Sequence, residues 1–220
     1  MTQTAAAVLS ASPTAAIAAS GELQIHLAGF PRLTDTRPRP VRLAWSEIAQ
    51  RLTVFDERTE KDGAGYSPAI YRPGTTRKNE HVEAITAAVL DIDHDTPAWE
   101  LFEGFEFVAH TTFSHTADDP HWRLILPLAR PVSAEEWPDV WERVRFRLCP
   151  NADDACKDVA RFYWKPAHQP GAAHDVRIGA GVVRDPAALP SPPPARPPAP
   201  APSPASATQG GRPGDDYATA

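Results

Sequence analysis

The 220-residue chain has little cysteine and no long apolar run. The first absence argues against a protein held together by disulfides, and the second argues against a membrane-spanning protein. Its two cysteines, Cys149 and Cys156, form neither a disulfide framework nor a CxxC zinc pattern, so we expect reduced thiols and a cytoplasmic location. No apolar stretch approaches the ~20 residues of a membrane span, so we expect no membrane partner. No Lys or Arg precedes Arg32, and residues 1–20 therefore lack the positive region of a secretory signal. The Walker A loop GxxxxGK[ST] is also absent, which assigns any helicase to another chain.

Positive charge is scarce as well. The chain carries 22 Lys and Arg against 28 Asp and Glu, a net charge of -6. This balance argues against a protein that binds nucleic acid over its whole surface, because such domains are usually basic. A local basic cleft remains compatible with it.

Proline is abundant but unevenly placed, and its distribution indicates the domain boundaries. Residues 186–220 are rich in Pro, Ala and Ser and nearly free of large apolar side chains, so they cannot offset the entropy of ordering. We expect a disordered tail whose removal leaves stability unchanged. Residues 1–20 are predicted to be a disordered Ala/Ser-rich arm, which leaves a single folded domain over residues 21–185.

Helical and strand-like patterns alternate within that domain. Strands are predicted over residues 84–93, 105–114, 122–128 and 159–164, and Pro127 indicates an edge or the end of its strand. Helices are predicted over residues 43–52, 97–104 and 133–150, and the first places Trp45, Ile48, Ala49 and Leu52 on one face. The last begins with a Ser133/Glu136 capping box but carries Pro138 in its second turn. The short strands favour an α+β fold, with a mixed sheet and flanking helices, over a doubly wound one.

The stretch VLDIDHDTP, residues 89–97, is the strongest chemical signal. Side chains of a strand alternate between faces, so Asp91 and Asp93 point the same way at the end of a buried strand. Adjacent carboxylates repel each other, and a pair in this position is typical of a site for Mg²⁺ or Mn²⁺. We expect these acids to hold ions and not the core.

Further polar residues follow downstream. The segment HTTFSHT ends a strand in hydroxyl groups and His115. The apolar strand WRLILPL contains Arg123, which needs an anionic partner, either a triphosphate or a structural carboxylate. The segment DDACKDVARFYWKP then supplies acids and, on one face of an extended strand, Arg161 and Lys165. Basic residues beside carboxylates in an acidic protein indicate a cleft that handles phosphate.

The order of these motifs resembles the archaeo-eukaryotic primase superfamily, in its plasmid- and phage-type primase-polymerase branch. The similarity covers residues 40–168 and includes the DxD pair, the FSHT segment, the phrase WRLILPLARPVSAEEW and the late segment KDVARFYWKP. That family has a core similar to an RNA-recognition-motif sheet. In one respect the chain departs from it, because Phe113 stands where the family's SxH motif has serine, with Thr112 and Ser114 on either side.

The resemblance implies a primase-polymerase that adds nucleotides on a single-stranded DNA template by a two-metal mechanism. Its substrates would be nucleoside triphosphates and its cofactor Mg²⁺ or Mn²⁺, in the replication of a plasmid, phage or mobile element. The implied metal ligands and catalytic acids are Asp91, Asp93 and Asp158, with Asp154 as the other candidate for the third acid. The implied nucleotide-binding residues are Ser114, His115, Arg123, Arg161 and Lys165.

Two alternative functions, different from nucleotidyl transfer, are also compatible with parts of the sequence. Residues 93–96, DHDT, match the DxDxT motif of haloacid-dehalogenase-type phosphohydrolases, whose fold requires a regular parallel strand–helix series. The second alternative is a non-catalytic protein, either a replication initiator or a nucleic-acid-binding relic.

Several polar residues receive plainer interpretations. We interpret His94 as helix-capping, Asp118 and Asp119 as an exposed turn, and His110 as a strand histidine satisfied locally. The pair Trp137 and Trp141 is predicted to be helix core.

Overall fold

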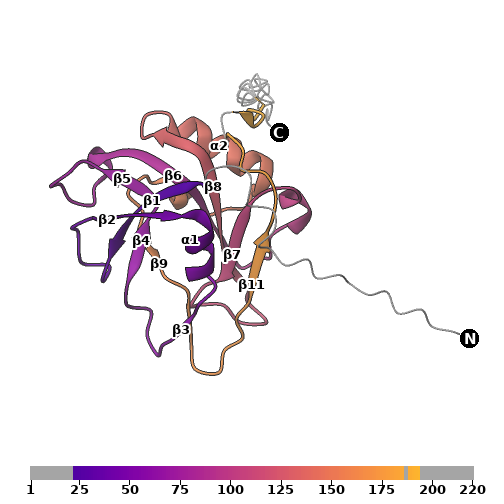
Figure 1. Ribbon diagram of the computed structural model, residues 1–220. Helices are drawn as coiled ribbons and strands as arrows, with labels where there is room; N and C mark the ends of the chain where they lie inside the picture. Colours follow the sequence, from indigo (N-terminus) through magenta and orange to yellow (C-terminus); the bar gives the residue numbers. More distant parts are fainter. Residues whose placement is uncertain (1–21, 186–187, 194–220) are drawn as a thin grey trace, which may run out of the picture.

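The computed structural model describes residues 22–185 and 188–193 (Figure 1). The predicted N-terminal arm, residues 1–20, lies outside the described residues, and so do residues 186–187 and 194–220 of the predicted tail.

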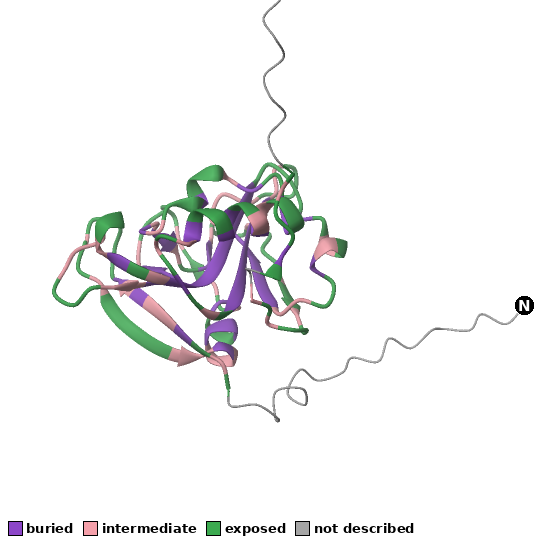
Figure 2. Ribbon diagram, turned by 90° about the horizontal axis from the view of Figure 1, so that it is seen from above, coloured by how far each residue is buried: buried purple, intermediate pink, exposed green. Residues whose placement is uncertain are grey.

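A five-stranded sheet carries the core. Its strand order is β11-β7-β8-β6-β5, and every pairing in it is antiparallel. The strands are β5 (Ala69–Tyr71), β6 (Val82–Asp93), β7 (Phe107–Thr111), β8 (His121–Ser133) and β11 (Val176–Gly179). Residues 84–93 of β6 have almost no polar side chain before Asp91, and this run is buried on both faces, as the burial colouring of Figure 2 shows for the central strands.

A second, four-stranded sheet packs beside it, with the order β2-β1-β4-β9. Its strands are β1 (Gln24–Phe30), β2 (Arg39–Ala44), β4 (Gly65–Ser67) and β9 (Tyr163–Trp164), again paired antiparallel. A short parallel pair joins β3 (Asp56–Glu57) to β10 (Ala167–His168). The close approach of β4 to β9 requires glycine at position 65, because a Cβ there would lie 2.4 Å from the backbone oxygen of Tyr163.

Two α-helices and several 3-10 turns flank the sheets (Figure 1). Helix α1 (Trp45–Arg51) buries Trp45, Ile48 and Ala49, the face predicted from their spacing. Helix α2 (Trp137–Leu148) packs on β6 and β8 through its apolar stripe, and Trp137 and Trp141 are core residues as predicted. The 3-10 turns are η2 (Asn79–His81), η3 (Trp99–Phe102) and η4 (Asp154–Lys157); η3 replaces the predicted helix 97–104.

Both prolines that conflicted with the sequence patterns have a structural explanation. Strand β8 does not end at Pro127 and is not at an edge, because it continues to Ser133 between β6 and β7. The β6–β8 register shifts between Ile85 and Ala87, and Pro127 lies opposite Ala87 at this irregularity, where a missing N–H is tolerated. Helix α2 begins at Trp137, which places Pro138 in the first turn, where no intrahelical bond is lost.

The predicted α+β class is confirmed, although the parallel contribution among the described residues is limited to short pairings. The antiparallel central sheet is also incompatible with the parallel strand–helix series of a haloacid-dehalogenase fold. The motif DHDT therefore has no phosphohydrolase scaffold around it.

Two further features concern residues with simple sequence interpretations. Cys149 and Cys156 are both buried and free, and burial raises the pKa of each thiol to about 12, so neither is a reactive thiolate. No helix in the part of the chain that the structure describes is long and apolar enough to cross a membrane.

Residues 188–193 belong to the segment assigned to the tail, and Leu189 among them is buried in the main core cluster. Its backbone oxygen accepts a hydrogen bond from Arg143 Nη1 at 3.0 Å. The side chain shares a small space with Val144 and Leu148 of α2. The folded domain therefore extends beyond residue 185.

We expect Leu189→Ala to lower the free energy of unfolding by about 2 kcal/mol, the lower end for a buried leucine, because the site lies at the margin of the core. The matched control is Leu33→Ala, which removes a side chain that is 46% exposed and should cost less than about 0.5 kcal/mol. Urea denaturation of the two variants measures both. Equal stabilities of the two variants would show that the segment containing Leu189 does not remain packed against α2.

Candidate active site

The DxD end of β6 opens into a cavity of about 230 Å³. The cavity lies between the two larger sheets, and β6, β7 and β8 supply one wall while the segment around β9 supplies the other. Its charged lining residues are Lys61, Asp91, Asp93, Arg123, Arg161 and Lys165. The cations outnumber the carboxylates, so this acidic protein has a locally positive cavity.

Asp91 forms the central interaction of the site. Asp91 on β6 and Arg123 on β8 are directly opposite in the antiparallel register. Arg123 Nε donates to Asp91 Oδ1 at 2.6 Å and Nη2 donates to Oδ2 at 2.9 Å, a bidentate pair that is buried on both sides. Burial alone would raise the pKa of Asp91, but the attraction of Arg123 outweighs it and holds that pKa below its usual value.

Arg123 is fully engaged by the protein. Its Nη1 donates to the backbone oxygen of Trp164 at 3.0 Å, and the guanidinium carbon lies 4.9 Å from the centroid of the Tyr163 ring. The anionic partner that an arginine in an apolar strand requires is therefore Asp91. Since all of its donor nitrogens are used, Arg123 positions Asp91 and ties β8 to β9.

Arg161 stands next to this pair. Its Nη2 lies 3.7 Å from Asp91 Oδ2 and donates to Asp153 Oδ2 at 2.9 Å. Asp153 in turn donates its backbone N–H to the backbone oxygen of Asp91 at 2.8 Å. The segment after α2 is thus fastened to the DxD strand through Asp153. The sequence pattern around Asp153 does not indicate this contact.

Asp93 has a different environment from Asp91. It is half exposed, and its Oδ1 bonds His121 Nδ1 at 2.8 Å. Its Oδ2 has no hydrogen-bond or ion-pair partner among the described residues. Burial lowers the pKa of His121, yet the hydrogen bonds to Asp93 and Asp119 raise it by more, so the net pKa is above its usual value.

The other predicted residues divide into those at the cavity and those outside it. Ser114 and Lys165 line the cavity, as do Asp91, Asp93, Arg123 and Arg161. His115 does not line it, and its Nδ1 instead accepts the backbone N–H of His121 at 3.1 Å.

The candidates for the third acid also lie elsewhere. Asp158 is exposed at the end of η4, and its Oδ1 accepts from the backbone N–H of Ala160 at 3.2 Å. Asp154 pairs with Lys157 and lies 3.8 Å from Arg145. The assignment of Asp158 as the third acid stays a prediction.

The implied pair of divalent ions requires carboxylates that meet at one point, and these three do not. Both oxygens of Asp91 accept from Arg123, and Asp158 does not line the cavity. Of the two acids that line the cavity, Asp93 is the one that offers a carboxylate oxygen without a partner among the described residues. The residues in their present arrangement therefore do not fit a two-ion site held by these three acids.

His110 and His121 are cavity residues that sequence reasoning did not select. His110 is almost completely buried and lies opposite Arg123 in the β7–β8 register. Its Nδ1 bonds the backbone oxygen of Thr111 at 2.8 Å, the expected local partner, whereas Nε2 is buried and has no partner among the described residues. Burial, with Arg123 nearby, lowers the pKa of His110 to about 4, so the ring is neutral at pH 7.

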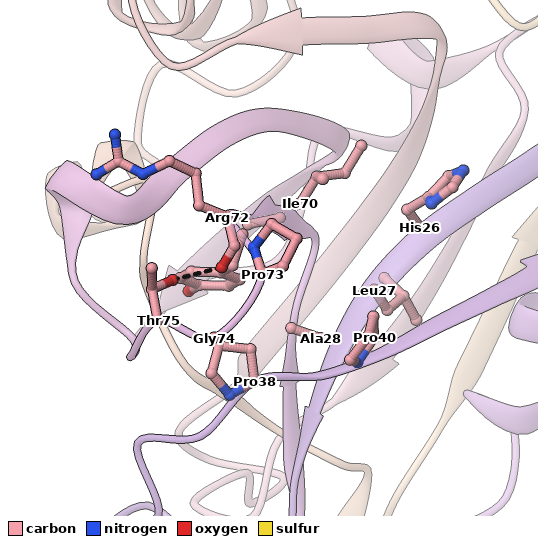
Figure 3. A pocket seen from close by; sticks show the side chains of 12 residues that line it. His26, Leu27, Ala28, Pro38, Pro40, Ile70, Arg72, Pro73, Gly74 and Thr75 are labelled. Atoms are coloured by element: carbon pink, nitrogen blue, oxygen red, sulfur yellow. Dashed lines mark hydrogen bonds between the residues drawn. The ribbon is translucent and has the colours of Figure 1, made fainter.

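A second cavity lies between β1 and the β5 region, and its lining differs from that of the first (Figure 3). It has a volume of about 310 Å³ and is lined by apolar side chains, prolines and the Arg72–Thr75 turn, in which Thr75 Oγ1 donates to the backbone oxygen of Arg72 at 2.6 Å. No carboxylate lines it. None of the predicted site residues is found there.

Comparisons with known proteins found one family model and one solved structure that are similar to this chain. Residues 45–177 match the family model described as the VapE N-terminal domain, a range that includes every predicted site residue. A solved structure, the AEP domain of the primase-polymerase of cyanophage S-2L, is similar over 74% of this chain and 85% of that chain, with 14% sequence identity and a TM-score of 0.41. No curated protein matches the chain. The family match confirms the resemblance that the motifs indicated.

The buried ion pair leads to a prediction about stability. Asp91→Asn leaves Arg123 buried without a counter-charge, so we expect the free energy of unfolding to fall by about 3 kcal/mol. Asp93→Asn is the matched control: Asp93 is half exposed, and its loss should cost less than about 1 kcal/mol. Urea denaturation at pH 7 provides the comparison, and equal losses in the two variants would contradict a structural role for Asp91.

The neutral His110 leads to a prediction about pH. Its pKa is about 4 in the folded protein and ~6.5 in an unfolded chain, so the unfolded state binds more protons between these values. Its contribution therefore reduces stability as the pH falls from about 6.5 to about 4, by roughly 3 kcal/mol in full. We expect His110→Leu to lose less stability than the wild type between pH 7 and pH 5 in urea denaturation.

The matched control for this pH effect is His174→Leu, at an exposed histidine. It should keep the wild-type pH dependence. An unchanged pH dependence in His110→Leu would show that His110 is not buried as a neutral ring.

Proposed function

The chain belongs to the VapE N-terminal domain family, and from this premise we propose that it is a nucleotidyltransferase of the primase-polymerase type in phage or plasmid replication. Its substrates are nucleoside triphosphates and its template is single-stranded DNA. The transferred group is a nucleotide, added to a 3′-hydroxyl with release of pyrophosphate.

One observation carries this proposal. All the residues that the motifs select, except His115, Asp158 and its alternative Asp154, line the same cavity although they come from four separate stretches of sequence. That cavity combines a DxD strand end with an excess of cations. Such a combination suits a triphosphate, whose oxygens need positive partners, better than it suits an uncharged ligand.

The cavity side chains have two different roles: one side chain positions other residues, and others contact the phosphate groups. Arg123 is occupied by Asp91 and Trp164, so it acts as a positioning residue. Lys165 is exposed and lines the cavity, and Lys61 faces it from another loop. We assign direct phosphate contact to these two lysines, assisted by the partly buried Arg161 and the hydroxyl of Ser114. The requirement for Mg²⁺ or Mn²⁺ stays part of the proposal and is tested by omitting the ion.

A second candidate function is nucleotide or DNA binding without transfer. It is favoured by the engagement of both Asp91 oxygens with Arg123 and by the position of Asp158 outside the cavity. The two candidates share the binding cavity and differ in catalysis. One assay that measures both binding and incorporation therefore separates them.

We expect the full chain to incorporate labelled nucleotides on single-stranded DNA in the presence of Mn²⁺, measured with and without a primer. Lys165→Ala should lower the rate at least tenfold, or ~1.4 kcal/mol in barrier, because it removes a phosphate contact. Lys157→Ala is the matched control, since Lys157 is exposed, pairs with Asp154 and lies outside the cavity. It should keep the wild-type rate.

The outcomes separate the candidates. Triphosphate and DNA binding that depend on Lys165, with no incorporation under any metal condition, would establish the binding module in place of the transferase. Absence of both binding and incorporation would remove both functions.

A pair of substitutions tests the third acid. If Asp158 is a metal ligand, Asp158→Ala abolishes metal-dependent incorporation, whereas Asp154→Ala changes it by less than about tenfold. Full activity in Asp158→Ala would remove Asp158 from the ligand set. Loss of incorporation in Asp154→Ala alone would assign the third acid to Asp154, four residues earlier in the sequence.

A further inference from the structure

A cluster of two histidines and one aspartate lies just beyond the cavity. His94 directly follows β6, Asp119 is in the turn that precedes β8, and His121 is the first residue of β8. The antiparallel register places Asp93 opposite His121 and so brings the end of one strand to the beginning of the other. The sequence predicts a helix cap at His94 and an exposed turn at Asp119, because this register is not visible in the sequence.

The three side chains converge. One nitrogen from each histidine and a carboxylate oxygen of Asp119 all lie within 4.8 Å of one another. His94 Nδ1 is 2.7 Å from Asp119 Oδ1, and His121 Nε2 is 3.1 Å from Asp119 Oδ2. Ligands about 2.0–2.2 Å from a tetrahedral Zn²⁺ lie roughly 3.3 Å apart, so an ion requires only small shifts of these side chains.

Asp93 completes the arrangement from behind. It accepts a hydrogen bond from His121 Nδ1 at 2.8 Å, and this bond directs the other nitrogen, Nε2, towards Asp119 and His94. Metal-ligating histidines usually donate their second N–H to a carboxylate, which fixes the tautomer and the orientation of the ring. The His121 side chain is 10% exposed, so it is held in place, whereas His94 is 73% exposed and leaves a path for an ion and water.

The backbone conformation of His94 is unusual. Its φ of 62° is the only positive value at a non-glycine residue in the described part of the chain. The left-handed region is costly for a residue with a Cβ, and it persists where the surroundings over-determine it. Here it turns the chain so that the imidazole faces Asp119 directly after the strand ends.

We propose that His94, Asp119 and His121 bind a first-row metal ion such as Zn²⁺ or Co²⁺, with Asp93 as the hydrogen-bonded support of His121. Two imidazoles and one carboxylate suit these ions, whereas Mg²⁺ and Ca²⁺ prefer ligand sets made only of oxygen. The three ligands are distinct from the acids assigned to nucleotidyl transfer, although Asp93 belongs to those acids and supports His121. Metal binding does not require that activity. Through Asp93 the site connects to the cavity, because the support of His121 leaves Asp93 Oδ2 as the oxygen available to a substrate.

The experiment uses the full chain without a histidine tag, freed of metal by a chelator and titrated with Co²⁺. We expect one Co²⁺ per chain, with visible d–d absorption bands that Zn²⁺ abolishes and a large excess of Mg²⁺ does not. Substitutions His94→Gln and Asp119→Asn should each weaken binding at least tenfold. Both residues lie on the surface side of the cluster, and far-UV circular dichroism should confirm that the variants fold.

Matched controls and a test of the supporting residue complete the design. His26→Gln and Asp118→Asn, outside the cluster, should bind Co²⁺ like the wild type. Asp93→Asn should keep the absorption bands and weaken binding by about 10- to 100-fold, the effect of losing a supporting carboxylate.

Failure to bind Co²⁺, or binding unaffected by His94→Gln and Asp119→Asn, would overturn the proposal and leave the cluster as a hydrogen-bonded network. Because no nucleotide is present, this result is independent of the outcome of the incorporation assay.

Discussion

The buried ion pair between Asp91 and Arg123 organises the whole site. It crosses the centre of the five-stranded sheet, where β6 and β8 are antiparallel neighbours, and it connects that sheet to β9 through the Trp164 carbonyl. A carboxylate and a guanidinium in such a position are stable only as a hydrogen-bonded pair, because either charge alone would lack solvation. The first acid of the DxD motif is thereby a structural element as well as a candidate for chemistry.

This pairing also sets the electrostatics of the cavity. Asp91 and Arg123 neutralise each other, so the charge that a ligand meets comes from Asp93 on one side and from Lys61, Arg161 and Lys165 on the other. The two acids of one motif consequently have different roles. Asp91 is enclosed and strongly ionised, whereas Asp93 is half exposed, bonded to His121, and shared between the cavity and the His94–Asp119–His121 cluster.

The sequence predicted what depends on local pattern. Alternation along β6 correctly placed Asp91 and Asp93 at the end of a buried strand, and helical spacing identified the buried faces of α1 and α2. What it missed depends on strand register and on exact element boundaries. The partner of Arg123 and the meeting of Asp93 with His121 follow from the β6–β8 register. The tolerance of Pro127 follows from an irregularity in that register, and the burial of Leu189 follows from the packing of residues 188–193 against α2.

The central claim is that the cavity recognises phosphate through its cationic side chains, and one binding measurement tests it most directly. Isothermal titration of the full chain with a nucleoside and with its mono-, di- and triphosphate, at two salt concentrations, compares the contribution of each phosphate. The account predicts that affinity rises with every added phosphate and that the triphosphate loses the most affinity at high salt, because the contacts are ionic. Equal affinities for the nucleoside and the triphosphate, or an affinity for the triphosphate that salt does not change, would contradict it.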